Sequence, residues 1–180
     1  RMTDPESPYY RQAMELYAAG FPLHEQRRPE EQIQAMKDPA FHCDALVESG
    51  TFIGLLFYWE AVGVTYVEHF AVVEALRSSG AGSRALAAFC PAHAPVVLEI
   101  DPPEDAVSTR RKGFYQRLGF AENSYAHRRP PYRTGFAPHP LVVMSWPEAL
   151  SPEAYSTFSR MLSHRVMRYA QVGISQLAVT

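Results

Sequence analysis

The chain has 180 residues, a length that predicts a single domain. Hydrophobic residues make up 47% and charged residues 20%, which excludes a disordered chain. Lysine and arginine total 17 against 19 acidic residues, so the net charge of -2 argues against nucleic-acid binding, which needs concentrated positive charge. The two cysteines, Cys43 and Cys90, lie far apart without a CxxC pattern, which argues against a disulfide framework or a thiolate zinc site.

The sequence carries no membrane or export signal that we recognise. No segment approaches the roughly 20 apolar residues that a membrane-spanning helix requires. Residues 1–7 are polar and lack the basic-then-apolar layout of a signal peptide. We therefore expect a cytoplasmic protein with no membrane partner.

The first forty residues predict two helices. Apolar residues in 9–19 recur at intervals of three, four and seven, the spacing of one helix face, and Gly20 ends the segment. Residues 21–28 predict a loop that contains Pro22. A second helix begins at Pro29, where proline and the following acidic residues suit a first turn, and it stops at Asp38-Pro39.

The pattern then changes to strands. Residues 41–48 and 51–60, joined by the turn Ser49-Gly50, predict a hairpin, and the turn Val62-Gly63 leads to a third strand at 64–72. These three strands should form an antiparallel meander.

The second half predicts alternating helices and strands. Helices are expected at 81–90, 106–118 and 152–169, and strands at 95–100, near 120–127 and at 141–145. Residues 128–140 predict a long loop, a feature that is often functional. The fold class is therefore α/β, with one domain over 1–180, a core of about 8–147, and an extra C-terminal helix and tail over 151–180; residues 170–180 have no clear assignment.

One turn combines the features of an anion site. Arg77, Gly80 and Gly82 lie between the strand at 64–72 and the helix at 81–90. The free amides and the dipole at a helix N-terminus suit a phosphate, and glycine lets the backbone approach it. The spacing is neither a Walker A loop nor a GxGxxG fingerprint, and taken alone it fits a simple turn equally well.

Two motifs in order indicate a family. Arg-x-x-Gly-x-Gly at 77–82 resembles the acetyl-CoA-binding motif of the GNAT superfamily of N-acetyltransferases, and Gly-Phe-Tyr-Gln-Arg-Leu-Gly-Phe at 113–120 resembles its second signature. One helix and one strand separate them, as in the family. The resemblance covers about 41–145. It implies a mostly antiparallel mixed sheet flanked by helices, in which the strand at 64–72 splays from the next strand and the thioester enters the gap.

The resemblance also implies the ligands. Acetyl-CoA would be the co-substrate, no metal would take part, and an amine would attack the thioester directly in a ternary complex. Family members often carry Asn seven residues before the motif tyrosine, where this chain has Ser108. Arg111 could attract the CoA phosphates, although a solvated basic turn explains it as well. The implied cofactor residues are Phe70, Ala71, Val72, Arg77, Ser78, Ser79, Gly80, Ala81, Gly82, Ser83, Ser108 and Arg111.

Two residues match catalytic positions of the family. Tyr115 matches the tyrosine that protonates the leaving CoA thiolate, with core packing as the alternative. Glu68 stands where the family may carry a base that deprotonates the amine. Strand alternation predicts that Glu68 shares a face with Phe70 and that His69 points the other way. A buried glutamate is costly unless it is paired; the alternative is a side chain that reaches solvent.

The acceptor region is expected around the loop at 21–25 and residues 123–139. Glu99 and Asp101 share one strand face and could relay protons or attract a cationic amine, although pairing with Arg110 or Arg111 is equally open. Histidines 127 and 139 are expected to be structural rather than metal ligands. The expected substrate residues are Phe21, Glu25, Glu99, Asp101, His127 and Tyr132.

These observations predict an acetyl-CoA-dependent N-acetyltransferase acting on a primary amine of a small molecule, with Glu68 as general base and Tyr115 as general acid. The alternatives are an acyl-CoA-binding or sensing module without turnover, and acetylation of a peptide or protein amine. A nucleic-acid role for Arg128-Arg129 and residues 110–112 is disfavoured by the overall charge. We expect no nucleic-acid partner and leave a homodimer open.

Overall fold

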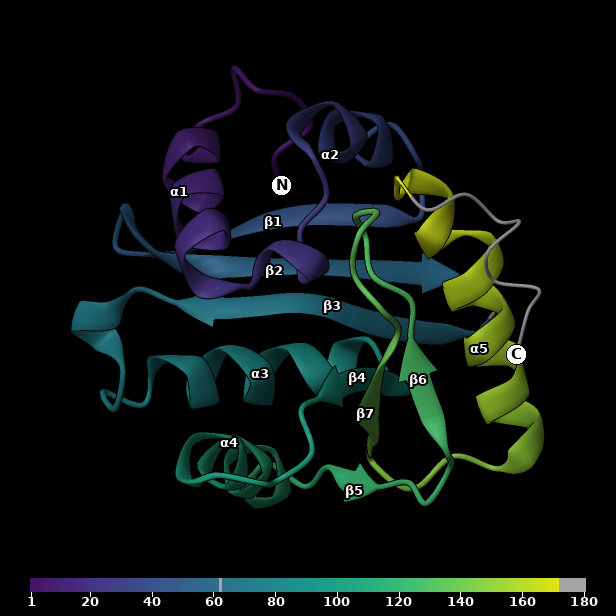
Figure 1. The fold of residues 1–180 in the computed structure, drawn as a ribbon. Helices are drawn as coiled ribbons and strands as arrows, with labels where there is room; N and C mark the ends of the chain where they lie inside the picture. The colour runs from purple at the N-terminus through teal and green to yellow at the C-terminus, as the bar shows by residue number, and fades with distance from the viewer. Residues whose placement is uncertain (62, 172–180) are drawn as a thin grey trace.

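Seven strands form one mixed sheet in the order β1-β2-β3-β4-β7-β5, with β6 paired to β7 beside this path (Figure 1). The computed structural model describes residues 1–61 and 63–171. Only β3 and β4 run parallel, and the other pairs are antiparallel. The strands are β1 (Phe41–Glu48), β2 (Thr51–Ala61), β3 (Val64–Val72), β4 (Val96–Ile100), β5 (Ala121–Glu122), β6 (His127–Arg129) and β7 (His139–Trp146).

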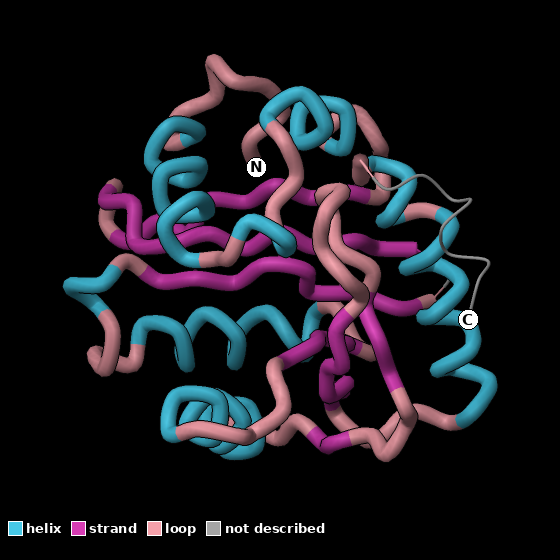
Figure 2. The backbone as a smooth tube through the Cα atoms, viewed as in Figure 1, coloured by secondary structure: helices cyan, strands magenta, loops and turns pink. Residues whose placement is uncertain are grey.

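Helices cover both faces of the sheet (Figures 1 and 2). The α-helices are α1 (Tyr10–Gly20), α2 (Pro29–Ala35), α3 (Ala81–Ala92), α4 (Ala106–Arg117) and α5 (Pro152–His164), with 3₁₀ turns η1 (Leu23–Glu25), η2 (Glu74–Leu76) and η3 (Val166–Tyr169). Buried residues of α1, α2 and α5 join one apolar cluster, and those of α3 and α4 join a second. The predicted α/β class, with a mostly antiparallel sheet and an additional C-terminal helix, is confirmed.

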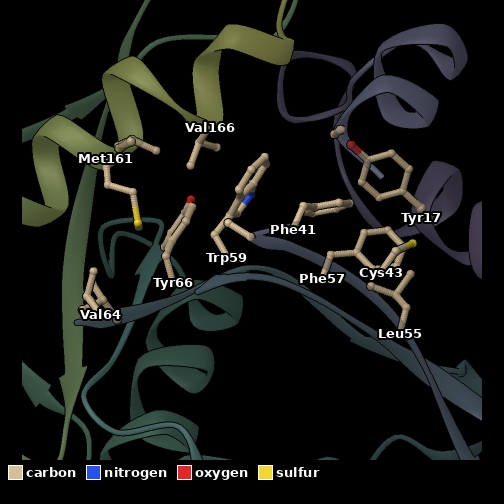
Figure 3. Close-up of a cluster of buried hydrophobic side chains, with 14 of the residues drawn as sticks. Tyr17, Phe41, Cys43, Leu55, Phe57, Trp59, Val64, Tyr66, Met161 and Val166 are labelled. Atoms are coloured by element: carbon tan, nitrogen blue, oxygen red, sulfur yellow. The ribbon is translucent and has the colours of Figure 1, made fainter. Parts of the chain in front are cut away.

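The larger core is aromatic. Phe41, Phe57, Trp59 and Tyr66 project from neighbouring strands toward α1 and the C-terminal helices (Figure 3). Trp59 and Tyr66 are fully buried, and the ring of Tyr66 lies 5.3 Å from that of Phe158 on α5. Aromatic side chains contribute large buried areas, so this layer fixes the C-terminal helix against the sheet. Both cysteines are buried and unpaired, as the sequence predicted.

Three boundaries differ from the predictions. The expected strand near 120–127 is divided into β5 and β6, and Asn123, which lies between them, donates from its side-chain nitrogen to the Val143 carbonyl (3.2 Å) and the Ser145 hydroxyl (2.9 Å). The expected loop at 128–140 is shorter, since β6 and β7 occupy both its ends. The last α-helix ends at His164, and a 3₁₀ turn follows.

Two earlier expectations lie partly outside the described residues, namely the turn at Val62 and the tail from residue 172 onward. Within the described part of the chain, no helix has the length and apolar character needed to cross a bilayer.

Candidate active site

The sheet opens between β3 and β4. The two strands pair only where residues 65–67 face residues 96–98. Further along, β3 stays bonded to β2 through Val72, while β4 stays bonded to β7 through Ile100. The opening contains a cavity of about 910 Å³, large enough for a cofactor-sized ligand. The predicted separation of these strands is confirmed.

The free edge of β3 forms one wall of this cavity. Phe70, Ala71 and Val72 all line it. Within the described residues, this edge of β3 has no strand partner beyond Val67. Its backbone donors and acceptors are therefore available to pair with an extended ligand, as an added strand would.

The N-terminus of α3 closes one end of the cavity. Its N-cap Gly80 has φ +80° and offers no side-chain cap to the first helical amides. A Cβ on Gly82 would lie 3.4 Å from both Phe70 and Val72, so glycine keeps this corner open. The Ala81 amide bonds to the Ser79 hydroxyl (3.3 Å), and the next amides of the helix N-terminus, at the cavity-lining Gly82 and Ser83, form a ready anion site.

Most of the predicted cofactor loop lies at this end. Five of its residues line the cavity, namely Arg77, Ser78, Gly80, Gly82 and Ser83. Ser79 and Ala81 do not. The Ser79 hydroxyl donates to the Leu76 carbonyl (2.8 Å) and accepts from the Ala81 amide (3.3 Å), and the Ala81 side chain is buried. These two residues shape the turn instead of lining the cavity.

Arginines make the same end of the cavity basic. Arg77, Arg110, Arg111 and Arg117 all line it, and Arg111 pairs with Asp101 at 2.7 Å. Of the two roles considered for Asp101, attraction of an amine or pairing with an arginine, the structure shows the pairing with Arg111. This positive charge suits a phosphorylated ligand.

Ser108 needs a correction. It is buried in the first turn of α4, where its hydroxyl donates to the N-cap residue Asp105 (2.8 Å) and accepts from the Asp105 amide (3.1 Å). It does not line the cavity. The predicted contact with the cofactor arm is not available, because the hydroxyl is used in the helix cap.

Tyr115 lines the cavity from α4. Its ring lies between Phe114 and Phe120, at 5.1 and 5.5 Å between ring centroids. Burial raises the pKa of the Tyr115 hydroxyl to about 12, so the phenol stays protonated at neutral pH. Tyr115 therefore combines core packing with a place in the cavity wall.

Glu68 accepts four hydrogen bonds from three side chains. Arg27 donates to both carboxylate oxygens (2.8 and 2.7 Å), Trp59 donates from its indole nitrogen (3.1 Å), and Tyr132 donates from its hydroxyl. The side chains of Glu68 and Arg27 are fully buried. Burial alone would raise the pKa of Glu68, but Arg27 and the hydrogen bonds hold it well below its usual range. A carboxylate so strongly held as an anion is a poor proton acceptor.

A β-bulge explains the unexpected position of Glu68. Val67 faces Tyr58, yet His69 faces Phe57, so Glu68 is an extra residue in β3. His69 therefore lies on the same side as Glu68 and packs edge-on against Tyr17 and Phe21 (centroids at 4.8 and 4.7 Å). The predicted alternation, with His69 opposite Glu68, is wrong because the bulge resets it.

A second buried network surrounds Glu99. Tyr66 donates to its carboxylate (2.5 Å), Arg129 donates at 3.0 Å, and His127 contacts the other oxygen. Burial alone would raise the pKa of Glu99, but Arg129 and His127 lower it. Arg129 also contacts Tyr132 and thus joins this network to the one around Glu68.

The predicted substrate residues therefore separate into two groups. Phe21, Glu25, Glu99 and Asp101 line the cavity together. His127 and Tyr132 do not line it, and they are 6% and 0% exposed. The prediction that these two side chains contact the substrate is therefore wrong. Their polar atoms are bonded within the buried networks around Glu68 and Glu99, and the two side chains support the cavity wall instead.

Comparisons with known proteins agree with this geometry. The sequence model of the acetyltransferase (GNAT) family matches residues 10–120. The structure aligns with a protein assigned to GNAT-family acetyltransferases from Bacteroides thetaiotaomicron, with a TM-score of 0.82 and 32% identity over 88% of this chain and 92% of that one. The chain belongs to the GNAT family. Membership confirms the predicted enzyme class, an acetyl-CoA-dependent acyltransferase.

More distant GNAT-like structures share the fold alone. An Arabidopsis thaliana protein in complex with the bisubstrate analogue CoA-Ac-MVNAL has a TM-score of 0.56 and 16% identity over 79% of this chain and 94% of that one. An aminoglycoside 6'-N-acetyltransferase complexed with coenzyme A has a TM-score of 0.53 and 16% identity over 79% and 92%. A search of curated proteins gave no match.

Sequence reasoning missed the cationic half of this GNAT site. Arg27 lies in a stretch predicted as a loop, and Trp59 was seen only as a strand residue, yet both hold Glu68. Glu68 itself indicated that such a partner exists, since a charged side chain inside an apolar strand requires a buried partner. Which arginine supplies it depends on tertiary contacts across 41 residues.

Proposed function

We propose that this GNAT chain transfers the acetyl group of acetyl-CoA directly to a primary amine of a small molecule, in a ternary complex. The observation that supports this most is the cavity between β3 and β4. Its lining combines the α3 N-terminus, Arg77 and Arg111 with the partly exposed Glu25, while Glu99 is paired with Arg129, which also lines the cavity. An anionic cofactor thus finds positive charge there, and a cationic acceptor finds the Glu25 carboxylate.

The cofactor end would bind the pyrophosphate with the first amides of α3 and the phosphates with Arg77 and Arg111. The pantetheine arm would pair with the β3 edge at Phe70–Val72. An amide at this edge near Val72 would polarise the thioester carbonyl, which places the reacting carbon in the open part of the cleft.

The chemical step needs two proton transfers. The neutral amine nitrogen attacks the thioester carbonyl carbon and the carbon–sulfur bond breaks. The leaving thiolate takes the Tyr115 hydroxyl proton, and the nitrogen, which is cationic after the attack, releases one proton to solvent to leave the neutral amide. Because burial raises the pKa of Tyr115 to about 12, this proton is present at neutral pH. Tyr115 afterwards regains a proton from water.

The base is reassigned within the proposal. Glu68 also lines the cavity, but its side chain is 0% exposed and is held by Arg27, Trp59 and Tyr132, so we assign it to support of the acceptor wall. Glu25 lines the same cavity with a side chain that is 20% exposed. We assign Glu25 as the general base that accepts the proton of the acceptor ammonium, directly or through a water molecule. An accessible carboxylate can attract the cation and afterwards release the proton to solvent.

The acceptor end supports a small substrate. The segment after β6 is bonded to the loop after α1, with the Tyr132 amide donating to the His24 carbonyl (2.8 Å) and Arg133 to the Gln26 carbonyl (3.0 Å). Figure 1 shows the β6–β7 hairpin reaching across the strands to this loop. Because these contacts join the two loops, they block the path along which an extended peptide substrate would leave the cavity.

The test is thiol release from acetyl-CoA with a panel of small primary amines and a matched panel of peptides. We expect turnover with small amines. Tight acetyl-CoA binding without any thiol release would favour a sensing module, and turnover with peptides alone would favour a peptide acceptor. No acetyl-CoA binding would overturn the proposal.

The variants Glu25→Gln and Glu68→Gln distinguish the catalytic role proposed for Glu25 from the structural role proposed for Glu68. We expect Glu25→Gln to reduce kcat by roughly 100-fold and to remove the acid limb of the pH profile, as loss of a general base does. Glu68→Gln should lower the free energy of unfolding and leave that limb in place. An acid limb that disappears in folded Glu68→Gln would return the base to Glu68.

A further inference from the structure

Two histidines and a glutamate meet at the acceptor end of the cavity. His24 and Glu25 belong to η1, and His139 begins β7, so the three converge from segments more than a hundred residues apart. Each is partly buried. Among the described residues, these are the histidine, cysteine and acidic side chains whose potential ligand atoms gather closely enough to hold a metal ion.

We propose that His24, Glu25 and His139 bind a divalent cation of the zinc class. Their potential ligand atoms all lie within 4.8 Å of one another. The Glu25 Oε1 atom is 3.7 Å from His24 Nε2 and 3.8 Å from His139 Nε2. Ligand atoms of a tetrahedral zinc ion lie about 3.3 Å apart, given bonds of roughly 2.0–2.1 Å. The two contacts of the carboxylate would therefore shorten by about half an ångström on metal binding, and the two imidazole nitrogens, which lie within 4.8 Å of each other, would also move toward the ion.

The imidazole of His139 supplies an independent observation. Both its ring nitrogens are shielded from solvent, and neither has a hydrogen-bond partner among the described residues. A buried unpaired polar group costs free energy, and a bound cation would satisfy Nε2.

The ligand set also indicates the class of cation and its affinity. Two imidazoles and one carboxylate suit zinc, with a fourth position left for water, whereas calcium and magnesium prefer oxygen ligands. His139 Nδ1 has no acceptor in the described residues to orient the ring. Since outer-shell partners strengthen metal binding, we expect micromolar affinity instead of the tighter binding of structural zinc sites.

Such a cation would regulate the proposed reaction, and this part of the inference rests on the proposed function. The ion would occupy the Glu25 carboxylate, which we assign to the acceptor ammonium. It would also bridge the loop after α1 to the start of β7. We expect zinc to inhibit competitively with the amine and to leave the affinity for acetyl-CoA unchanged.

Direct titration tests the site without any assay of activity. A tag-free chain is titrated with zinc chloride by calorimetry and with cobalt chloride by visible absorption, which reports low-coordinate cobalt. We expect one equivalent bound with micromolar affinity. His24→Ala and His139→Ala should each weaken binding at least about 100-fold, above the roughly 10–100-fold loss typical of outer-shell partners.

The matched control is His93→Ala. His93 and His42 contact the two oxygens of Glu60 (2.5 and 3.1 Å), which gives a second histidine–glutamate cluster outside the cavity. This variant should bind zinc as the parent chain does. Circular dichroism verifies folding, and Glu25→Gln serves as the second ligand variant if either alanine variant unfolds.

The results separate the two proposals. Absence of zinc binding in the parent chain, or equal binding in His24→Ala, His139→Ala and the parent, overturns the metal site whatever the acetyl-transfer assay shows. Zinc binding that depends on both histidines supports it even if no amine is acetylated.

Discussion

The two ends of the active-site cavity are built in different ways. The backbone of the cofactor end comes from one continuous stretch, residues 70–83, which forms a free strand edge and the N-terminus of α3, and α4 adds the side chains of Arg111 and Tyr115. The acceptor end is held by side chains from distant segments. Its contacts join residues 27 and 68, 68 and 132, and 99 and 129, which lie 41, 64 and 30 positions apart.

The difference predicts different responses to substitution. Backbone groups at the cofactor end bind ligand without being needed for the core, so changes there should affect affinity. The acceptor end contains buried ion pairs, and loss of one partner leaves an uncompensated charge. Changes in that network should therefore affect folding before they affect chemistry.

The largest expected effect is that of Arg27→Met. Removing the guanidinium leaves the Glu68 carboxylate buried beside Trp59 and Tyr132 without its main cation. We expect the free energy of unfolding, measured by urea denaturation, to fall by about 3–5 kcal/mol. Arg84→Met is the control, since the Arg84–Glu48 pair is exposed and should contribute less than about 1 kcal/mol. Equal losses in the two variants would contradict the contrast between the two ends.

Tyr115→Phe tests chemistry at the cofactor end. The substitution keeps the ring between Phe114 and Phe120 and removes the hydroxyl. We expect kcat to fall roughly 100-fold, the lower range for loss of a general acid. The dissociation constant of acetyl-CoA should stay the same. Tyr125→Phe, which removes a hydroxyl bonded to the Leu150 carbonyl (2.8 Å), is the control and should keep kcat. Unchanged turnover by Tyr115→Phe would rule out the acid role.

Gly82→Val tests binding at the same end. Its Cβ would already lie 3.4 Å from Phe70 and Val72, and its branches would occupy the corner next to the α3 amides. We expect acetyl-CoA affinity, measured by calorimetry, to weaken roughly tenfold, equivalent to about 1.4 kcal/mol. Ala87→Val adds bulk to an exposed position of the same helix and should bind normally. Tight binding by Gly82→Val would place the pyrophosphate elsewhere.

The same contrast explains what the sequence could predict. The loop at 77–83 could be predicted because a strand, a glycine turn and a helix follow one another in the sequence, and Tyr115 was predicted from the resemblance of residues 113–120 to a GNAT signature. The prediction that Glu68 and His69 lie on opposite faces of β3 was wrong because of the β-bulge. The bulge depends on how β3 pairs with β2, and the alternation of residues in the sequence does not show that pairing. His127 and Tyr132 were assigned to substrate because polar aromatic side chains in a loop look accessible, whereas their burial depends on Glu99 and Arg129.

The smallest expected effect concerns the support behind the acceptor end. Asp38, after α2, accepts hydrogen bonds from Arg165 (2.6 and 3.1 Å) and Tyr169 (3.0 Å) at the C-terminal end of α5 and in η3. Arg27 reaches the same region through the Val166 carbonyl (3.4 Å). Burial alone would raise the pKa of Asp38, but the bonds from Arg165 and Tyr169 lower it below 3.8.

Because the folded-state pKa of Asp38 is lowered, its stabilising effect is present above the unfolded-state pKa and is lost as the pH falls through the folded-state value. Asp38→Asn should therefore reduce the free energy of unfolding by about 1 kcal/mol at pH 6, with the difference from the parent shrinking below about pH 4. Urea denaturation at a series of pH values measures this difference, with Glu15→Gln as an exposed carboxylate control. A difference that persists at pH 3 would show that Asp38 acts through packing and not through its charge, and that the C-terminal support is apolar.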